Sequence, residues 1–379
     1  MSEITVDKIN NSAGTGAANF TYGIKVGGVA QSIGSGTFTS SDTEPSSPSD
    51  GDIWYQPTLR YLDYRAGGEW KRVIGSGTSN PPAYFGDRML VAGGGIDISP
   101  YRTSAIRYID LTGSGGSTNF GSLTSSRNGA HGATGDTRGI FAGGVISNYI
   151  NNIEYVTIPT TGNSTDFGDL TEIMMASSAS DGTYAIFALG DGANAYNGSI
   201  SQITIATTGN ATSWSGTLTT NRGNGSGASD GTKGFFFGGY ETGYVNTIDY
   251  VTIATDANAT DWGDLIVARN GSGDSACGTN SRVLTAGGQI SGSKTDAIEY
   301  INPASASNAY DFGNLTSQMG MTTSACNSTK ACWVGGTYTN GVKTDTQQIV
   351  TIDTTGNASA FGTYSIALQS GGSCSGAAS

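Results

Sequence analysis

A short apolar segment that ends in two glycines recurs along most of this chain. Its copies read LVAGG, IFAGG, FFFGG, LTAGG and CWVGG, and IFALG is a degenerate copy. They end at Gly94, Gly144, Gly190, Gly239, Gly288 and Gly336, so the repeated unit has about 48 residues. A fixed period of this length is typical of proteins built from one repeated supersecondary unit.

Within each unit, apolar and polar residues alternate in short segments that predict β-strands. Examples are residues 153–158 (IEYVTI) and 248–253 (IDYVTI), and an aromatic residue before a glycine comes later in the unit. These rings are Phe120, Phe167, Trp262, Phe312 and Phe361, with Trp214 in a shifted copy. Alternation with a period of two, broken by Gly-Asn turns, predicts antiparallel strands. Because four short strands in such a unit form a propeller blade, the six units predict an all-β, six-bladed β-propeller.

The two ends of the repeat region predict how the ring of blades closes. The first unit opens on residues 88–94 (RMLVAGG), with no inner strand before it. The last unit is followed by residues 371–376 (GGSCSG), which have the pattern of an inner strand. We therefore expect the C-terminal strand to complete the first blade, an arrangement that leaves no exposed sheet edge.

The connections that follow the glycine pairs should all emerge on one face of the propeller. They vary most in length and sequence, and five of the six carry tyrosine. The tyrosines are Tyr101, Tyr149, Tyr196, Tyr240, Tyr244 and Tyr338. Variable loops on a rigid scaffold often bind ligands, and an exposed tyrosine offers a flat apolar face with a polar tip. These rings are candidate ligand-binding residues, and the alternative is that they fold back onto the blades.

Several features of the repeat resemble the kelch family. They are the glycine pair, the later aromatic residue and an arginine near the following inner strand, found at Arg127, Arg222 and Arg269. The resemblance covers roughly residues 84–379, with degenerate copies in the third and sixth units, and it implies a kelch-like β-propeller domain at residues 79–379.

Composition narrows the classes of partner. The chain has 59 glycines and a net charge of −12, which argues against nucleic acid or an anionic membrane as the main partner. No apolar run is long enough to span a bilayer, so we expect no membrane insertion. The N-terminus does not have the pattern of a secretory signal, and we expect the protein to begin in the cytoplasm of the cell that makes it.

The cysteines and the single histidine do not form a recognisable chemical site in the sequence. Cys277, Cys326 and Cys374 fall at one repeat position. Earlier units place Ala133, Ala179 and Ala228 there, so the position suits a small buried side chain. Cys332, in the next strand, is also expected in the core. No arrangement around His131 matches a catalytic triad or a metal site. We predict no catalytic residues, no metal and no cofactor, and a protein that is not an enzyme.

The first eighty or so residues lie outside the repeat phase. We divide them into an anchoring arm (1–39), a Ser/Pro-rich linker (40–50) and a small β-meander (51–78). A three-stranded meander is marginal alone, so docking or oligomerisation would stabilise it. Its candidate anchoring residues, with those of the arm, are Ile4, Val6, Ile9, Phe20, Ile24, Trp54 and Trp70.

Two N-terminal segments are similar to segments near the N-termini of tailed-phage virion proteins, especially tail fibres and capsid-attached fibres. They are ITVDKINNSAGTGAANFTYGI and GDIWYQPTLRYLDYRAGGEWKRVIG. The repeats at residues 151–170 and 246–265 resemble those of marine phage structural proteins. The resemblance implies a virion protein that binds capsid or tail proteins through its N-terminal region. A homotrimer is a further expectation, because phage fibres are commonly trimeric.

Three functions remain open at this level. The propeller could bind the host surface, with carbohydrate as a plausible ligand. It could instead be a capsid or tail decoration protein without a specific ligand. A glycan-active enzyme is the third class, but the sequence has no unique carboxylate pair or metal cluster to support it.

Overall fold

The computed structural model describes residues 4–10, 19–26, 29–41, 45–50, 52–56, 61–66, 68–72, 86–135, 137–172, 174–192, 195–271 and 276–376. All regular secondary structure in these ranges is β-strand, and no helix that could cross a membrane occurs in them. The chain divides into two compact units, residues 1–79 and 80–379.

The N-terminal unit contains one six-stranded sheet. Its strands are β1 (Ile4–Asn10), β2 (Asn19–Val26), β3 (Val29–Ser40), β4 (Ile53–Gln56), β5 (Tyr61–Ala66) and β6 (Glu69–Arg72), in that order across the sheet. Neighbours are antiparallel except β3 and β4, which run parallel. The arm and the meander, which we treated as separate parts, therefore share a sheet through the β3–β4 pair.

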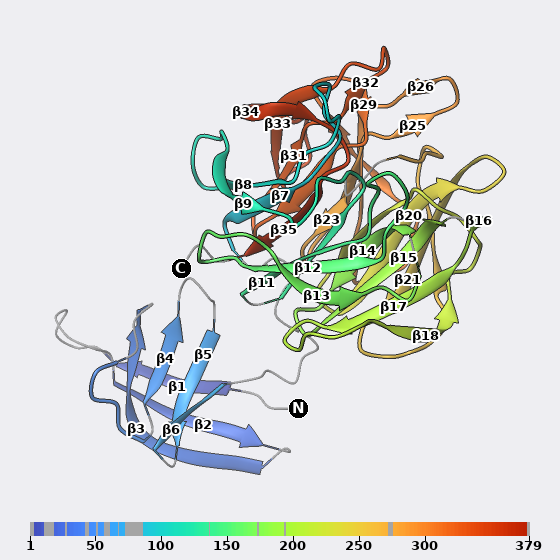
Figure 1. Cartoon of the computed structure of the whole chain (residues 1–379). Helices are drawn as coiled ribbons and strands as arrows, with labels where there is room; N and C mark the ends of the chain where they lie inside the picture. The colour runs from blue at the N-terminus through green and yellow to red at the C-terminus, as the bar shows by residue number, and fades with distance from the viewer. Residues whose placement is uncertain are drawn as a thin grey trace. The chain divides into compact units, whose positions relative to one another are not determined.

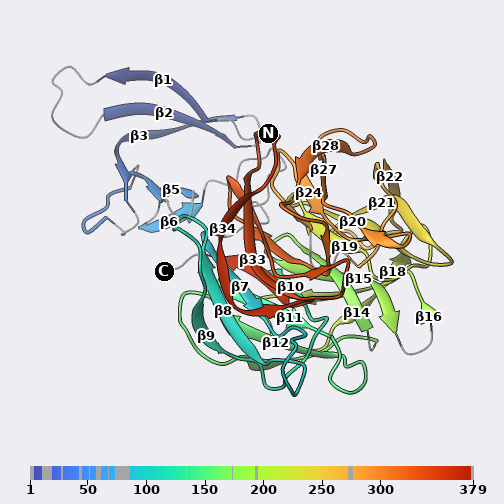
Figure 2. The same cartoon turned by 90° about the horizontal axis from the view of Figure 1, so that it is seen from above.

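The second unit is a ring of six four-stranded antiparallel sheets (Figures 1 and 2). Blade 1 contains β35 (Gly372–Gly376), β7 (Arg88–Ala92), β8 (Ala105–Asp110) and β9 (Thr118–Ser122), from the inside outward. Blade 2 contains β10 (His131–Thr134), β11 (Arg138–Ala142), β12 (Asn152–Thr157) and β13 (Thr165–Asp169). Blade 3 contains β14 (Met174–Ser180), β15 (Tyr184–Gly192), β17 (Ser199–Thr204) and β18 (Thr212–Thr217).

The other three blades repeat this order. Blade 4 contains β19 (Ser226–Ser229), β20 (Lys233–Tyr240), β21 (Tyr244–Thr252) and β22 (Thr260–Asp264). Blade 5 contains β23 (Ala276–Gly278), β24 (Val283–Ala286), β27 (Ala297–Ile301) and β28 (Tyr310–Asn314). Blade 6 contains β30 (Thr323–Cys326), β31 (Lys330–Val334), β33 (Thr344–Thr351) and β34 (Ser359–Leu368). Short strands in the connections are β16 (Ala195–Tyr196), β25 (Gln289–Ile290), β26 (Ser293–Lys294), β29 (Met319–Gly320) and β32 (Thr337–Tyr338). The six-bladed all-β fold predicted from the repeat is confirmed.

Blade 1 is assembled from both ends of the repeat region. The last strand, β35, pairs antiparallel with β7, and its Cα partners run from Gly372 opposite Ala92 to Gly376 opposite Arg88 (Figure 1). This is the closure expected from the sequence, because the first unit has no inner strand of its own. The pairing ties the ring together and leaves neither strand as an open edge.

The aromatic-glycine motif is explained by the contact between neighbouring blades. A Cβ atom built on Gly168 would lie 2.4 Å from the carbonyl oxygen of Gly209, in the turn of the next blade. The same turn supplies Asn210, whose Oδ1 accepts a hydrogen bond of 3.0 Å from the backbone N–H of Asp169. Equivalent amide oxygens come from Asn163, Asn258, Asn308 and Asn357. The repeated Gly and Asn therefore serve as a clip between blades.

The inner strands surround a narrow central cavity of about 70 Å³ lined by small side chains. Hydroxyl groups link neighbouring inner strands: Ser178 Oγ donates to the Gly132 carbonyl at 2.5 Å, and Ser373 Oγ donates to the Ser324 carbonyl at 2.6 Å. Small residues recur at these positions because six strands converge there.

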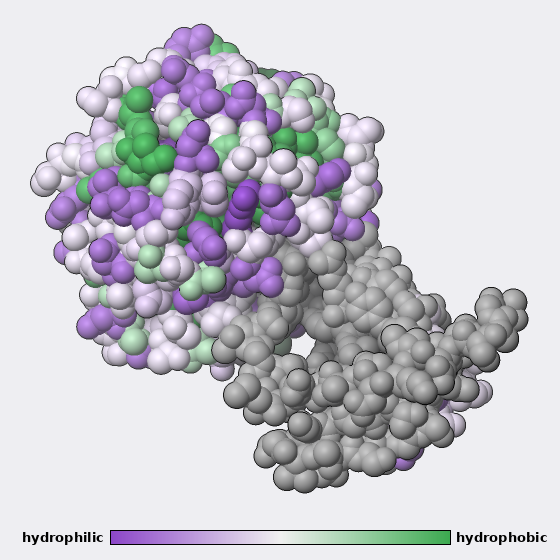
Figure 3. Space-filling model, turned by 180° about the vertical axis from the view of Figure 1, so that it is seen from behind, coloured by the Kyte–Doolittle hydropathy of each residue, from purple (hydrophilic) through white to green (hydrophobic). Residues whose placement is uncertain are grey.

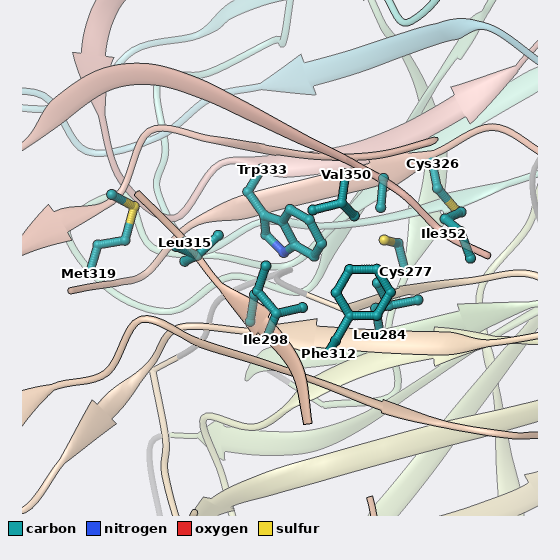
Figure 4. Close-up of a cluster of buried hydrophobic side chains, with 12 residues drawn as sticks. Cys277, Leu284, Ile298, Phe312, Leu315, Met319, Cys326, Trp333, Val350 and Ile352 are labelled. Carbon is teal, nitrogen blue, oxygen red and sulfur yellow. The ribbon is translucent and has the colours of Figure 1, made fainter. Parts of the chain in front are cut away.

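All four cysteines are buried and reduced. Cys277 and Cys326 belong to the apolar cluster between blades 5 and 6, at the same end of the cluster as Ile352 (Figure 4). Burial raises the pKa of Cys332 to about 12. A hydrogen bond with Cys326, together with burial, raises the pKa of Cys277 well above its ordinary value. Cys277 and Cys332 are therefore protonated core groups at neutral pH.

Buried ion pairs occur in blades 2, 4 and 5 and join the entry of the inner strand to the third strand. The pairs are Arg127–Glu154 at 2.5 Å, Arg222–Asp249 at 2.8 Å and Arg269–Glu299 at 3.2 Å, and every side chain is at most 1% exposed. The arginines that carry the kelch resemblance are thus internal to the blades and unavailable to a ligand.

A row of backbone hydrogen bonds, which we call the collar, connects the segments that lead into five of the six inner strands. The N–H of Gly129 donates to the Ser370 carbonyl at 2.7 Å, and the N–H of Ser370 donates to that of Met321 at 2.9 Å. Met321 donates to Gly271 at 2.5 Å, and Gly271 donates to Asn224 at 2.8 Å. All five residues have positive φ angles between 50° and 67°. The collar links blades 4, 5, 6, 1 and 2 in sequence and supports the loops around it.

Candidate loop face of the propeller

The antiparallel order of strands gives the propeller two different faces. The connections after the glycine pairs, between second and third strands, share one face with the connections that lead from each outer strand to the next inner strand. We call this the loop face. The first strand β7 starts, and the last strand β35 ends, on the opposite face, where Arg88 pairs with Gly376. The chain therefore enters the propeller on the side away from the loops.

The glycine pairs turn the chain onto the loop face. Gly93 has a φ of 68°, and a Cβ atom there would lie 2.6 Å from the Arg127 carbonyl of the next blade. A larger residue would clash with backbone and would also be strained, so the position requires glycine. The repeated pair thus sets where each variable loop begins.

Large exposed apolar side chains gather on the loop face. Of the six found among the described residues, five lie on this face and only Tyr310 lies on the other. The five, with their exposed fractions, are Ile98 (66%), Tyr101 (65%), Ile266 (58%), Val342 (52%) and Ile146 (37%). In the view of Figure 3 the described surface is mostly polar, with separate apolar areas between polar ones.

Four of these side chains belong to the loops of three consecutive blades, 6, 1 and 2. They are Val342, Ile98, Tyr101 and Ile146, and we call them the apolar patch. An isolated exposed aliphatic residue is ordinary, but several on adjacent loops suggest an interaction surface. The repeat pattern alone does not predict the three aliphatic residues of this patch.

Polar contacts hold the loops of the apolar patch together. Lys343 forms an ion pair with Asp97, which joins the loops of blades 6 and 1. Arg102 Nε donates to Asn128 Oδ1 at 3.0 Å, and the backbone of Asn128 pairs with that of Val145 in blade 2. The three loops are therefore positioned relative to one another by contacts within the propeller.

A further contact extends this support to blade 5. Lys294, at the end of the β25–β26 hairpin, donates hydrogen bonds to the carbonyls of Thr337 at 2.7 Å and Tyr338 at 2.9 Å. Burial lowers the pKa of Lys294 from its ordinary value. The loop that carries Val342 is thus held from both neighbouring blades.

Tyr101 is presented by a tight turn in the blade 1 loop. Its N–H donates to the Ile98 carbonyl at 2.7 Å, and its carbonyl accepts from the Ile96 N–H at 3.1 Å. Its φ is 67°, a left-handed value that is uncommon for a residue with a large side chain. Residues held in such conformations cluster at functional sites. The backbone on both sides of the exposed ring is fixed.

The other candidate tyrosines are half-buried. Tyr196 and Tyr240 meet edge to face across blades 3 and 4, with ring centroids 5.9 Å apart, and Tyr240 and Tyr244 do so at 5.4 Å. The hydroxyl of Tyr338 bonds to Thr344 Oγ1 at 3.1 Å, and Tyr149 is half-buried in the blade 2 loop. The structure therefore divides the candidate set: three rings pack on one another, and Tyr101 faces solvent.

The candidate anchoring residues lie in the strands of the N-terminal sheet. On β1 and β2, Ile4 is opposite Ile24 and Ile9 is opposite Phe20, while Val6 is opposite Tyr22. Trp70 is opposite Arg65 in the β5–β6 pair. Trp54 is buried, and its Nε1 donates to the Ser41 carbonyl at 2.8 Å.

No cluster of three or more His, Cys, Asp or Glu side chains suited to a metal ion occurs in the ranges described above. His131, the single histidine, is buried in the inner strand of blade 2. The loop face presents the exposed apolar side chains described above, with the charged residues Asp97, Arg102 and Lys343 in the same loops.

Comparison with known proteins identifies the architecture. No protein-family model matches the chain, and no curated protein matches its sequence. Among solved structures, that of YjhT, a propeller protein, is similar with a TM-score of 0.58. The match covers 72% of this chain and 97% of that one at 12% identity. At this identity the likeness shows the fold alone, and the protein is a six-bladed β-propeller with an N-terminal β-sheet unit.

Proposed function

We propose that this protein is an adhesion component of a phage particle. In this proposal the N-terminal unit binds other virion proteins of the capsid or tail, and the propeller binds the host surface through its loop face. The observation that carries the proposal is the gathering of exposed apolar side chains on the face opposite the point where the chain enters the propeller. A chain with an N-terminal attachment unit and a propeller that carries an apolar loop face suits a displayed binding head.

The phage context is supported by sequence resemblance. The opening residues, the segment from residue 51 and the kelch-like repeats with their Gly-Asn turns are similar to those of tailed-phage structural proteins. The net charge of −12 argues against nucleic acid as the main partner. Location in the virion, and trimer formation through the N-terminal unit, belong to the same proposal.

The test is binding of the purified full-length protein to a glycan array and to a panel of bacterial cells. We expect binding to cells of the host, and a loss of it when Tyr101→Ala removes the exposed ring. The matched control is Tyr310→Ala, which removes an exposed ring, 50% accessible, from the opposite face. Equal binding by wild type and Tyr101→Ala would contradict a role for this part of the loop face.

A decoration protein without a ligand is the alternative, and an adsorption experiment separates the two. Phage particles that lack the protein should adsorb more slowly if it is an adhesin. Unchanged adsorption, with the protein located on the particle by electron microscopy, would favour the decoration role.

A further inference from the structure

We infer that the apolar patch binds a protein surface whose apolar side chains surround a carboxylate, and that Arg102 receives that carboxylate. This inference rests on the proposed function, because it names the class of partner for the same loop face. Its evidence is the composition of the patch, the state of the polar groups around it and the position of Arg102.

The composition of the patch favours a protein over a sugar. Three of its four members are aliphatic, and only Tyr101 offers an aromatic face. Sugars expose hydroxyl groups all round, so their sites need convergent hydrogen-bonding groups beside the ring that stacks. The centre of a protein interface is instead apolar, with aromatic and arginine anchors. Ile98, Ile146 and Val342 fit the second description.

The charged side chains of the patch loops already make contacts within the propeller. Asp97 and Lys343 pair with each other, and Asn128 Oδ1 accepts from Arg102 Nε. A sugar hydroxyl would have to compete with these contacts. A protein partner would bury the apolar side chains and leave these polar contacts intact at the edge of the interface. The edge of a protein interface is usually polar.

Arg102 provides the charge complementarity. Among the residues that the structure describes, it has no carboxylate partner, and its one hydrogen bond uses Nε. Asp97, the acidic side chain beside it in the loop, is taken by Lys343. Arg102 follows Tyr101 in the chain, and the terminal nitrogens of its half-exposed side chain suit a carboxylate, which arginine binds through two parallel hydrogen bonds. Because the chain as a whole is strongly acidic, this local positive charge also selects the orientation of an acidic partner.

The patch is organised before binding. The turn that presents Tyr101 is fixed by hydrogen bonds on both sides, and the loops of blades 6, 1 and 2 are tied together. A surface that does not have to order its own loops retains more of the free energy of association. It therefore suits recognition of a partner by shape and charge.

The probe for this inference is a random-sequence peptide library displayed on particles and selected on the full-length protein. The library is first depleted on the Ile98→Ser/Tyr101→Ala variant, so that only peptides specific for the patch remain. We expect the enriched peptides to combine apolar residues with Asp or Glu. Synthetic copies should bind the wild type in a fluorescence anisotropy titration.

Single variants then assign the roles. Tyr101→Ala and Arg102→Gln should each weaken peptide binding by tenfold or more, and only Arg102→Gln should remove the preference for a peptide with Asp or Glu over its Asn or Gln counterpart. Tyr310→Ala, on the opposite face, should leave binding unchanged. Thermal unfolding of each variant shows that it is folded.

The outcomes separate this inference from the proposed function. If no peptide distinguishes wild type from the depleting variant, the inference is wrong. If a glycan binds and Tyr101→Ala abolishes that binding while no peptide is enriched, the partner is a sugar, and the adhesion proposal stands without the inference. If host cells bind equally to wild type and Tyr101→Ala, and no peptide is enriched, both are wrong for this surface.

Discussion

Blades 2 and 6 build the same junction from different chemistry. In blade 2, Glu154 Oε1 accepts from the Thr124 hydroxyl at 2.7 Å, and Glu154 also pairs with buried Arg127. In blade 6, Gln348 stands at the same register, opposite Trp333 as Glu154 is opposite Phe141. Its Oε1 accepts from the Thr316 N–H at 2.6 Å and from the Thr316 hydroxyl at 2.7 Å.

The residue at the arginine position changes together with the acid. Met319 of blade 6 replaces the arginine, and Gln348 Nε2 lies 3.2 Å from its sulfur. Blade 3 places Met174 and Ser201 at the two positions, and blade 1 places Leu368 and Arg107. Arginine and carboxylate therefore occur together in three blades. In the other three blades, the first position has no arginine and the second has no carboxylate.

In blades 2 and 6 the side chain at this position accepts hydrogen bonds from the preceding threonine, and it is charged only where an arginine pairs with it. A buried charge is costly when its partner is missing, whereas a neutral pair of similar volume can replace an ion pair at little cost. The two positions therefore change as a unit, and single and double substitutions should give very different results.

Breaking one pair should give the largest effect. Arg127→Met leaves the Glu154 carboxylate in a fully buried site, with hydrogen bonds from Thr124 and Ser164 but no cation to pair with. We expect a loss of about 3–5 kcal/mol in the free energy of unfolding. Denaturant unfolding of the full-length protein measures it, with Met319→Leu as the neutral control in blade 6. A loss below about 1 kcal/mol would contradict the unit interpretation.

Replacing both partners should restore most of that stability. Arg127→Met/Glu154→Gln copies the blade 6 pair into blade 2, where the glutamine has the same length as the glutamate. We expect the double variant to unfold within about 1.5 kcal/mol of the wild type, as volume-conserving core exchanges do. A double-mutant cycle with Glu154→Gln gives the coupling. If the losses of the two single substitutions simply add in the double variant, the two positions are not coupled, and contacts other than this pair stabilise blade 6.

The comparison between blades also shows what the sequence could predict. The number of blades, their closure and the position of the variable loops follow from a period that survives even in the degenerate copies. Arg127, Arg222 and Arg269 stood out in the sequence, but their partners were interpreted only as strand residues. The sequence does contain a signal for these ion pairs: Glu or Asp occurs at the partner position only in the units that carry the arginine.

The loop face was harder to predict because exposure there depends on neighbouring blades. Tyr196 is covered by Tyr240 of the next blade, a contact that no alternation pattern encodes. Tyr101 is exposed because a turn aims it outward, and Ile98 and Val342 are single aliphatic residues in polar loops. The repeat period predicts where the loops lie. Whether a loop side chain is exposed depends on its contacts with neighbouring loops, which the period does not predict.

A smaller effect of opposite sign is expected at the turn between the first two strands. In blade 3, Asp181 Oδ1 accepts from the N–H groups of Thr183 at 2.9 Å and Tyr184 at 2.7 Å. In blade 6, Asn327 makes the same two bonds, to Thr329 and Lys330, with a neutral amide. Burial raises the pKa of Asp181, so its charged form is disfavoured in the folded protein.

Asp181→Asn should therefore stabilise the protein at neutral pH. A raised carboxyl pKa means stability that is complete below the unfolded value, near 3.8, and is lost as the pH rises through the folded value. The gain should be fully present at pH 8 and shrink as the pH falls toward 4 in a series of thermal melts. A gain that does not change with pH would show that ionisation of Asp181 is not its cause.

The smallest effect is expected in the collar, where the comparison is between blades 1 and 2. Ser370 and Gly129 occupy equivalent places with φ angles of 50° and 67°. A left-handed conformation costs a residue with a Cβ atom about 1–2 kcal/mol, and glycine offsets part of that with roughly 0.5–1 kcal/mol of extra chain entropy. Ser370→Gly should therefore raise the free energy of unfolding by no more than about 1 kcal/mol, and Gly129→Ser should lower it by a similar amount. Both are measured by denaturant unfolding. If both substitutions destabilise the protein, the serine hydroxyl contributes to the collar, and the backbone conformation alone does not decide the residue.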